Sequence, residues 1–237
     1  ILNNTIQGSF SNGMSLGYVS PDTLIKGNEI SGDYYGIYLY RGNPQIIENV
    51  IKESDNGIYL SYASPIIKGN TITNLYNGIH CDYTETYAEI SENDIKENEY
   101  GIYCHNQSNP AIHFNNIEKN RSYGVYNGDC GFTVDATNNW WGDATGPYHP
   151  VDNPGGLGNQ VSDCVAFDPW LPSPVALLAA APQAVAKFSI GPSYPNPGNP
   201  ESWFPYSLAD ETDVTIRIYN ASGQLVRTLH LGTKPAG

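Results

Sequence analysis

Positive charge and long hydrophobic runs are both scarce in this sequence of 237 residues. Lysine and arginine total 11 against 24 aspartates and glutamates, which gives a formal net charge of −13. A field of that sign repels polyanions, so nucleic acid and anionic membrane surfaces are not expected as partners. The longest apolar stretch, residues 174–186, is interrupted by proline and is shorter than the roughly 20 residues that cross a bilayer. No membrane insertion is therefore predicted.

What the sequence does contain is one phrase repeated six times. Stretches such as DYYGIYLYRGNPQIIENVI and DNGIYLSYASPIIKGNTI share a glycine that recurs every 21 to 23 residues. These glycines are Gly13, Gly36, Gly57, Gly78, Gly101 and Gly124. Such a period is typical of a solenoid, in which a repeat buries its apolar side chains by stacking on its neighbours. Because the first residues already belong to a repeat, the chain is expected to be a processed or excised piece.

An asparagine column and three apolar columns run through the repeats. The asparagines are Asn28, Asn49, Asn70, Asn93 and Asn115, preceded by Asn4 and followed by Asn138. Isoleucines lie three residues before and two residues after each central asparagine, in short segments rich in Ile, Tyr and Val. Such segments favour strands over helices. Coils of this length, stacked roughly 4.8 Å apart, predict an all-β fold, a right-handed parallel β-helix of about six coils.

The asparagine column has a structural explanation in such a fold. Asparagine tolerates left-handed backbone angles at a tight corner better than most residues do. Its side-chain amide can also hydrogen-bond the equivalent amide in the coils above and below. The column is therefore predicted to form a ladder along the solenoid axis.

Four cysteines are too few for a disulfide framework in a chain of this size. Cys81 and Cys104 occupy the same position in successive repeats, and the simpler interpretation is a pair of buried free thiols that act as small hydrophobic side chains. Cys130 and Cys164 lie in the last coil and in the loop that follows it. A disulfide between them would pin that loop to the end of the solenoid.

Periodicity stops near residue 141, and the composition then divides the chain further. The predicted segments are β-helix repeats at 1–141, a capping loop region at 142–172, a linker at 173–186 and a small partial β-sandwich module at 187–237. Trp140 replaces the isoleucine that follows the asparagine column. Its ring is expected to cover the open end of the core, although tryptophan pairs can also bind sugars.

The repeats and the NNWWGDATGPYHP and FDPWLP passages resemble the right-handed parallel β-helix proteins of bacterial and archaeal cell surfaces, over residues 1–172. The SYPNPGNP and IYNASGQLVRTL stretches resemble the start of immunoglobulin-like modules, of the secretion or sorting type, in secreted bacterial proteins. These resemblances imply an extracellular or cell-surface location. Alternation in DVTIRIYNASG and QLVRTLHLG independently predicts two antiparallel strands joined at residues 221–223, while the later strands of the module are missing.

The first candidate site is a file of outward-facing aromatic side chains. In the repeated GIYL, isoleucine and leucine should point inward and tyrosine outward. This alignment places Tyr38, Tyr59, His80, Tyr103 and Tyr126 on one outer face, with Tyr40, Tyr62 and Tyr83 nearby. Tyrosine can stack on sugar rings, so the candidate residues for binding a polysaccharide or cell-surface glycan are Tyr38, Tyr59, Tyr62, Tyr83 and Tyr126. Cross-strand tyrosine pairs also stabilise sheets, and that purely structural interpretation stays open.

The second candidate site is a titratable cluster of His80, Asp82, Tyr103 and His105 on neighbouring outer positions. An imidazole beside a carboxylate can act as a general base, so these four are the candidate catalytic residues. The alternative is ordinary surface residues. The N-T-D, D-D, G-H-G and R-I-K motifs of β-helix pectin hydrolases are absent, and the repeats contain only two arginines with which to neutralise a uronate.

No cofactor or metal site is predicted. Loop aspartates could supply the oxygen ligands that Ca²⁺ prefers, although their irregular spacing makes solvated loop carboxylates the simpler interpretation. They are Asp143, Asp152, Asp163 and Asp168. Taken together, the sequence predicts an extracellular, non-catalytic β-helix module that binds carbohydrate or serves as a structural scaffold. The alternative is a polysaccharide lyase, glycoside hydrolase or epimerase with its site on the middle coils, and no oligomeric state is predicted.

Overall fold

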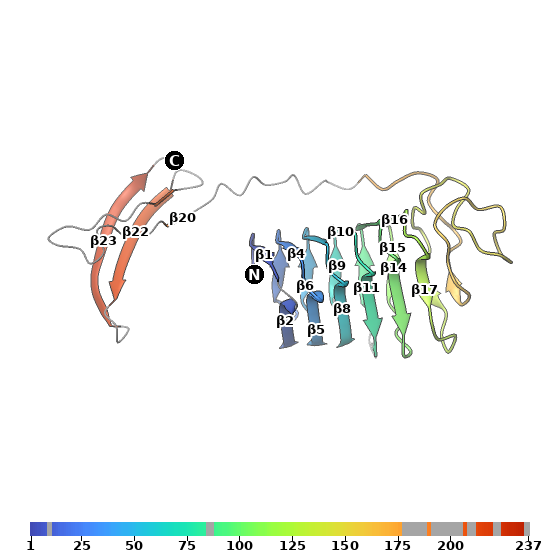
Figure 1. The fold of residues 1–237 in the computed structure, drawn as a ribbon, viewed down its shortest axis with the longest axis horizontal. Coiled ribbons are helices and arrows are strands. Elements are labelled where there is room, and N and C mark those ends of the chain that lie inside the picture. Colours follow the sequence, from blue (N-terminus) through green and yellow to red (C-terminus); the bar gives the residue numbers. More distant parts are fainter. Residues whose placement is uncertain are drawn as a thin grey trace. The chain divides into compact units, whose positions relative to one another are not determined.

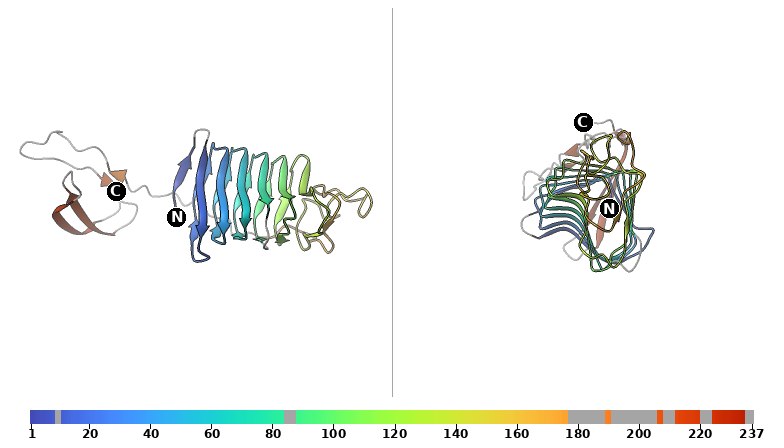
Figure 2. Two further views of the ribbon diagram at one scale, coloured as in Figure 1. Left: turned by 90° about the horizontal axis from the view of Figure 1, so that it is seen from below. Right: turned by 90° about the vertical axis from the view of Figure 1, so that its right-hand side faces the viewer.

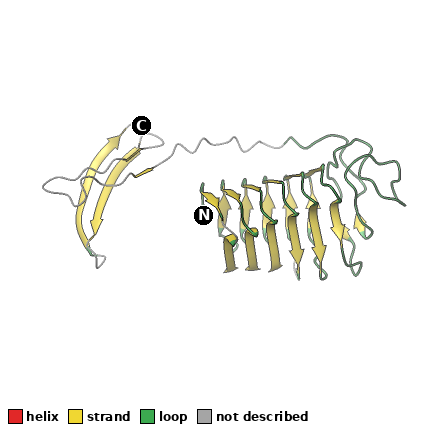
Figure 3. Cartoon of the chain, in the orientation of Figure 1, coloured by secondary structure: helices red, strands yellow, loops and turns green. Residues whose placement is uncertain are grey.

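The structure is a computed structural model, and it describes residues 1–8, 11–83, 88–176, 189–190, 206–207, 212–219 and 224–234. The chain divides into two compact units, Ile1–Ala180 and Ala181–Gly237. The described residues form strands and turns, and no helix occurs among them (Figure 3). Those residues accordingly include no apolar helix long enough to cross a membrane.

The first unit is a parallel β-solenoid whose coils each contribute strands to three sheets (Figures 1 and 2). The first sheet contains β1 (Thr5–Gln7), β4 (Glu29–Ser31), β7 (Val50–Lys52), β10 (Thr71–Thr73), β13 (Asp94–Lys96) and β16 (Asn116–Glu118). The second contains β2 (Asn12–Val19), β5 (Tyr35–Gly42), β8 (Asn56–Ala63), β11 (Asn77–Asp82), β14 (Tyr100–His105) and β17 (Tyr123–Asn127). The third contains β3 (Leu24–Lys26), β6 (Gln45–Ile47), β9 (Ile66–Lys68), β12 (Glu89–Ser91), β15 (Ala111–His113), β18 (Val134–Asp135) and β19 (Val165–Ala166). Neighbouring strands pair in parallel, which confirms the predicted β-helix of about six coils.

The core consists of isoleucine columns, one in each sheet. In the second sheet Ile37, Ile58 and Ile79 pair in register, and each is 0% exposed. Burying a side chain of this size contributes about 1.5–3 kcal/mol, so the columns are a major source of stability. Glycine is required near the start of these strands because neighbouring coils approach each other closely there. A Cβ atom on Gly57 would lie 2.5 Å from the carbonyl oxygen of Gly78.

The predicted asparagine ladder is confirmed. Asn49 Nδ2 donates to Asn70 Oδ1 at 2.9 Å, and Asn70 Nδ2 donates to Asn93 Oδ1 at 2.9 Å. Each amide also donates to backbone carbonyls inside the corner. The predicted left-handed backbone of these asparagines is wrong. The left-handed residue is the one before each asparagine, as at Glu48 (φ 53°) and Glu92 (φ 54°), so the ladder position itself is selected for its amide.

A second asparagine column, which was not predicted, lies at another corner of the coil. Asn98 Nδ2 donates to Asn120 Oδ1 at 3.0 Å, and Asn120 Nδ2 donates to Asn159 Oδ1 at 2.9 Å. Asn159 belongs to the loop region that follows the repeats. This column therefore joins that loop to the last coils through partly buried hydrogen bonds.

Two predictions at the end of the solenoid are wrong by one residue. Asn139, not Asn138, continues the ladder, and its Oδ1 accepts from Asn115 Nδ2 at 3.0 Å. Trp141, not Trp140, then takes the isoleucine position. The Trp141 side chain is fully buried at the end of the core, whereas Trp140 is only partly buried. Asn138 instead has the left-handed backbone that precedes each ladder asparagine.

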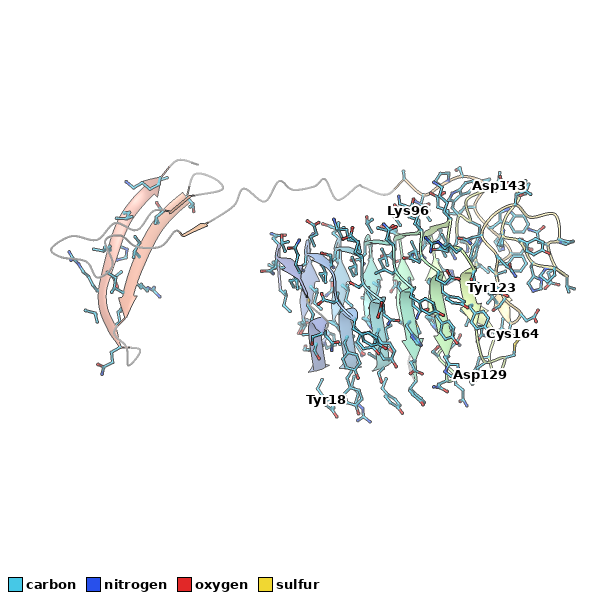
Figure 4. The ribbon with its side chains drawn as sticks, viewed as in Figure 1. Tyr18, Lys96, Tyr123, Asp129, Asp143 and Cys164 are labelled. Atoms are coloured by element: carbon cyan, nitrogen blue, oxygen red, sulfur yellow. A yellow bond between two sulfur atoms is a disulfide. The ribbon has the colours of Figure 1, made fainter. Side chains whose placement is uncertain are left out.

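A disulfide joins Cys130 to Cys164 and fastens the loop region to the last coil (Figure 4). The two cysteines are 34 residues apart in the sequence. Closing a loop of that length lowers the entropy of the unfolded chain and thereby stabilises the folded state by about 3–4 kcal/mol. Cys81 and Cys104 pair in register and are free and buried. Their predicted role as small hydrophobic side chains is confirmed.

The second unit contains two antiparallel strand pairs among its described residues. One pair is β20 (Ser189–Ile190) with β21 (Tyr206–Ser207), and the other is β22 (Thr212–Tyr219) with β23 (Leu225–Lys234). The predicted hairpin strands are confirmed, and the predicted connection at 221–223 lies outside the described residues. Most of the predicted linker at 173–186 also lies outside them, and the immunoglobulin-like fold stays a prediction.

Candidate functional site

Aromatic side chains at the GIYL position form a row on the outside of the second sheet. In-register pairing aligns Tyr38, Tyr59, His80, Tyr103 and Tyr126, which we call the outer aromatic row. The rings of Tyr38 and Tyr59 are stacked, with centroids 5.5 Å apart and planes 8° apart. His80 meets its neighbours edge-on, at 4.8 Å from Tyr59 and 5.0 Å from Tyr103.

Stacking turns the faces of neighbouring rings toward each other. The row therefore presents ring edges and phenol hydroxyl groups over much of its length. Two tyrosines that were not predicted extend this surface: Tyr35 lies 4.8 Å from Tyr59, and Tyr100 lies 5.7 Å from Tyr126. Burial, followed by the neighbouring Tyr34 side chain, raises the pKa of Tyr35 to about 12. Its hydroxyl consequently stays protonated near neutral pH.

The predicted residues Tyr62 and Tyr83 belong to a separate column at the end of the strands. Their rings are stacked, with centroids 5.1 Å apart and planes 9° apart. Tyr18 and Arg41, which were not predicted, have the same left-handed backbone in the two preceding coils. We call Tyr18, Arg41, Tyr62 and Tyr83 the corner column. Figure 4 shows Tyr18 at the edge of the first coils, pointing away from them.

The Asp82 carboxylate, a predicted catalytic group, is held by hydrogen bonds from two other coils. Its Oδ2 accepts from the Tyr59 hydroxyl at 2.6 Å, and its Oδ1 accepts from Asn106 Nδ2 at 2.8 Å. His105 pairs with Asp82 in register, and its Nδ1 is 4.0 Å from Oδ1. The side chain of Asp82 is only 12% exposed. This carboxylate thus serves as a hydrogen-bond acceptor between coils.

The imidazole of His80 lies between aromatic rings instead of against this carboxylate. No hydrogen bond joins His80 to Asp82 within the described structure. Burial lowers the pKa of His80, so the ring is neutral at pH 7. Burial, followed by the hydrogen bond to Asp82, raises the pKa of Tyr59 far above its ordinary value. The predicted cluster is brought together, with Tyr103 beside His80, but its hydrogen bonds link tyrosine to carboxylate.

Three of the four loop aspartates considered as Ca²⁺ ligands, Asp143, Asp152 and Asp163, contact other side chains of the loop region. Asp143 Oδ1 accepts from the hydroxyl and the backbone N–H of Thr145, and these two hydrogen bonds lower the pKa of Asp143. Asp152 and Asp163 approach opposite nitrogens of His149, each at 3.2 Å. Across the described ranges, no three His, Cys, Asp or Glu side chains are grouped so that they could hold a metal ion.

A cavity of about 330 Å³ lies at the C-terminal end of the repeats, between the last coils and the loop region. Its lining includes Lys119, Arg121, Trp141 and Leu157. None of the predicted site residues contributes to it. The outer aromatic row and the corner column are therefore surface sites, separate from this cavity.

Residues 1–163 match the family described as periplasmic copper-binding protein (NosD). The chain belongs to the NosD family. No curated protein and no solved structure matches it. The periplasmic description of the NosD family confirms the predicted location outside the cytoplasm.

The NosD description mentions copper, so the sulfur-containing side chains of this chain are possible copper ligands. Copper sites in proteins draw on cysteine, methionine and histidine. Met14, the one methionine, is buried in the core at 6% exposure. Cys130 and Cys164 are bonded to each other. Hydrogen bonding to Cys104, followed by burial, raises the pKa of Cys81, which keeps this thiol protonated rather than a metal-binding thiolate.

The five histidines do not supply a copper site either. In His149, Nδ1 accepts the backbone N–H of Asp152 at 3.0 Å and Nε2 donates to Asp163, in the tautomer that satisfies both bonds. His113 Nδ1 donates to the Thr137 carbonyl at 2.9 Å, which leaves Nε2 beside one carboxylate. His230 contacts Thr215 on the separate hairpin. The described residues of this NosD-family chain therefore do not fit a copper centre.

Proposed function

We propose that this NosD-family β-helix is a non-catalytic scaffold outside the cytoplasm that binds carbohydrate along its outer aromatic row and corner column. The observation that carries the proposal is repetition in register. The same outward position holds an aromatic ring in five successive coils, from Tyr38 to Tyr126. A polymer with a regular repeat is a natural ligand for a surface that repeats at the spacing between coils, about 4.8 Å.

The chemistry of the surface supports a sugar ligand. Phenol hydroxyls both donate and accept hydrogen bonds, as sugar hydroxyls do, while the ring edges contact the apolar C–H groups of a sugar. The ends of the corner column are open, with Tyr18 72% exposed and Tyr83 44% exposed. These side chains offer ring surface that no neighbouring tyrosine covers completely.

The hydrogen bonds of Asp82 support the non-catalytic part of the proposal. A general base must reach the proton it removes, with a pKa suited to that task. Asp82 accepts hydrogen bonds from Tyr59 and Asn106, and His80 is enclosed by the rings of its own row. We assign these side chains to the stability of the row. Affinity electrophoresis through gels that contain polysaccharides tests the proposal, with variants of the outer aromatic row as probes.

A further inference from the structure

Each coil has turn positions with a left-handed backbone, and they align into three columns. The first column is Asn3, Gly27, Glu48, Gly69, Glu92, Phe114 and Asn138. The second column is Gly32, Glu53, Asn74, Glu97, Lys119 and Gly142. Both mix glycine and asparagine, which adopt this conformation at the lowest cost, with larger residues such as Glu48 and Glu53. The third column is Tyr18, Arg41, Tyr62, Tyr83 and Asn106, with φ between 49° and 55°.

The corner column keeps large planar side chains in four successive coils, at positions where small residues would fold more easily. A left-handed backbone costs a bulky residue roughly 1–2 kcal/mol. That cost recurs in four successive coils of the third column, at Tyr18, Arg41, Tyr62 and Tyr83. Bulky residues also occupy left-handed positions in the other two columns, as at Glu48 and Glu53. What distinguishes the corner column is that four large planar side chains follow one another in successive coils and contact one another.

Arg41 differs from the lysines of the solenoid in its partners. All five lysines of the repeats form ion pairs: Lys26 with Glu48, Lys52 with Glu29, Lys68 with Glu92, Lys96 with Asp94 and Lys119 with Glu118. Arg41 forms no ion pair or hydrogen bond with the described residues, despite the excess of acidic side chains. Its guanidinium carbon lies 5.8 Å from the Tyr18 ring, 5.5 Å from the Tyr40 ring and 5.6 Å from the Tyr62 ring.

Tyrosine rings thus hold an exposed guanidinium in place without using its N–H donors. Cation–π contacts of this kind contribute about 0.5–1 kcal/mol each at exposed sites and limit the motion of the side chain. The free donors form a planar fork that matches a carboxylate in a bidentate arrangement. Arg41 is consequently organised in advance to bind an anionic group.

We infer that the corner column binds a carbohydrate that carries isolated carboxylate groups, with one carboxylate on Arg41 and the neighbouring sugar residues on Tyr62 and Tyr83. This inference rests on the proposed carbohydrate-binding function and adds the chemical class of the ligand. Densely charged polymers are disfavoured, because the chain has a net charge of −13. A neutral backbone with occasional uronate branches satisfies both the single cation and the acidic surroundings.

Isothermal titration calorimetry with two matched probes tests the inference. The probes are xylohexaose and the same hexasaccharide with a single glucuronosyl branch. The wild-type chain is expected to bind the branched probe about tenfold more tightly, and this preference should shrink as salt is raised. Arg41→Gln keeps a planar amide but removes the charge, so it should bind both probes equally. Arg121→Gln is the matched control, since Arg121 lies outside the corner column, and it should retain the preference.

The outcomes separate this inference from the proposed function. Equal binding of both probes by the wild-type chain would overturn the role of Arg41 and leave carbohydrate binding intact. Failure of the wild-type chain to bind either probe would overturn the inference. Failure to bind any polysaccharide at all would overturn the proposed function as well. A preference that persists in Arg41→Gln would also overturn the assignment. Arg41→Lys provides a second test, because it keeps the charge but loses the fork and should fall between the wild type and Arg41→Gln.

Discussion

The hydroxyl group of Tyr59 donates a 2.6 Å hydrogen bond to Oδ2 of Asp82, one coil further along the solenoid. Asn106, from the next coil again, donates to Oδ1 of the same carboxylate at 2.8 Å. One aspartate thereby links three successive coils on the outer face. Hydrogen bonds to a charged acceptor are stronger than those between neutral groups, so this link is expected to stabilise the middle of the outer aromatic row.

Tyr59→Phe removes the hydroxyl group and keeps the ring. The variant is expected to lose about 1–2 kcal/mol of unfolding free energy, because Asp82 then lacks one of its two donors. Urea denaturation measures the loss. Tyr38→Phe is the matched control, since Tyr38 lies in the same row and its hydroxyl makes no hydrogen bond with the described residues. Equal effects of the two substitutions would contradict the role given to the carboxylate.

Asn70→Ala removes a fully buried rung from the asparagine ladder. Asn70 Oδ1 accepts from the backbone N–H and the side chain of Asn49, and its Nδ2 donates to Asn93. The loss leaves several buried polar groups without partners, so we expect destabilisation of about 3 kcal/mol or more in urea. Asn4→Ala, at the exposed start of the ladder, should cost about 1 kcal/mol or less. Similar losses at both positions would argue against a cooperative ladder.

The solenoid is expected to become less stable as the pH is lowered, because of His80. Burial lowers the pKa of His80, so the folded chain binds this proton less tightly than the unfolded chain does. The contribution of neutral His80 is therefore complete above the ordinary histidine pKa of about 6.5 and is lost as pH falls toward the lower folded value. Urea unfolding at pH 7.5 and pH 5 measures how much unfolding free energy the wild type and His80→Tyr each lose between the two pH values.

His80→Tyr continues the tyrosine row without a group that titrates in this range, so its stability should decrease less between pH 7.5 and 5. His80→Gln serves as the second variant. It should also reduce the pH dependence, but with lower stability at pH 7.5 because the aromatic contacts are lost. A wild-type pH dependence in both variants would show that another group is responsible.

Copper is expected to leave the stability of this chain nearly unchanged. A ligand present at 100 times its dissociation constant would add about 2.7 kcal/mol to the unfolding free energy. Because the residues that the structure describes do not fit a copper centre, a tenfold molar excess of Cu²⁺ should shift the melting temperature by less than about 1 °C. Differential scanning calorimetry with and without a chelator measures the shift. A rise of several degrees would contradict this account of the histidines and cysteines.

The repeat itself made most of the fold predictable. Gly57 and Gly78 fix the period, and the isoleucines placed regularly around Asn70 fix which side chains enter the core. Stacking of identical coils then leaves one arrangement that buries all the columns. The errors of alignment came at the end of the repeats, where the NNWW stretch offers two alignments one residue apart. Only the pairing of the last coil decides that Asn139, rather than its neighbour, accepts the ladder hydrogen bond.

The candidate site was predictable in part, because strand alternation places Tyr38 and Tyr59 on the outer face. Arg41 was missed as part of a site, since neither its charge nor its residue type signals a left-handed turn between two tyrosines. The partner of Asp82 was missed for a related reason. The sequence pattern placed this carboxylate beside His80, whereas the long side chain of Tyr59, one coil earlier, is the one that donates a hydrogen bond to it. Contacts between coils depend on side-chain length and direction, which a repeat alignment does not contain.

The most direct test of carbohydrate binding is affinity electrophoresis of wild type, Tyr38→Ala/Tyr126→Ala and Phe114→Ala through gels with neutral and uronate-bearing polysaccharides. Phe114 is the matched control, an aromatic side chain 49% exposed outside the outer aromatic row. At least one polysaccharide should retard wild type and Phe114→Ala, and it should retard the double variant, still folded by circular dichroism, clearly less. Free migration of wild type in every gel, or equal retardation of the double variant, would contradict carbohydrate binding by the outer aromatic row.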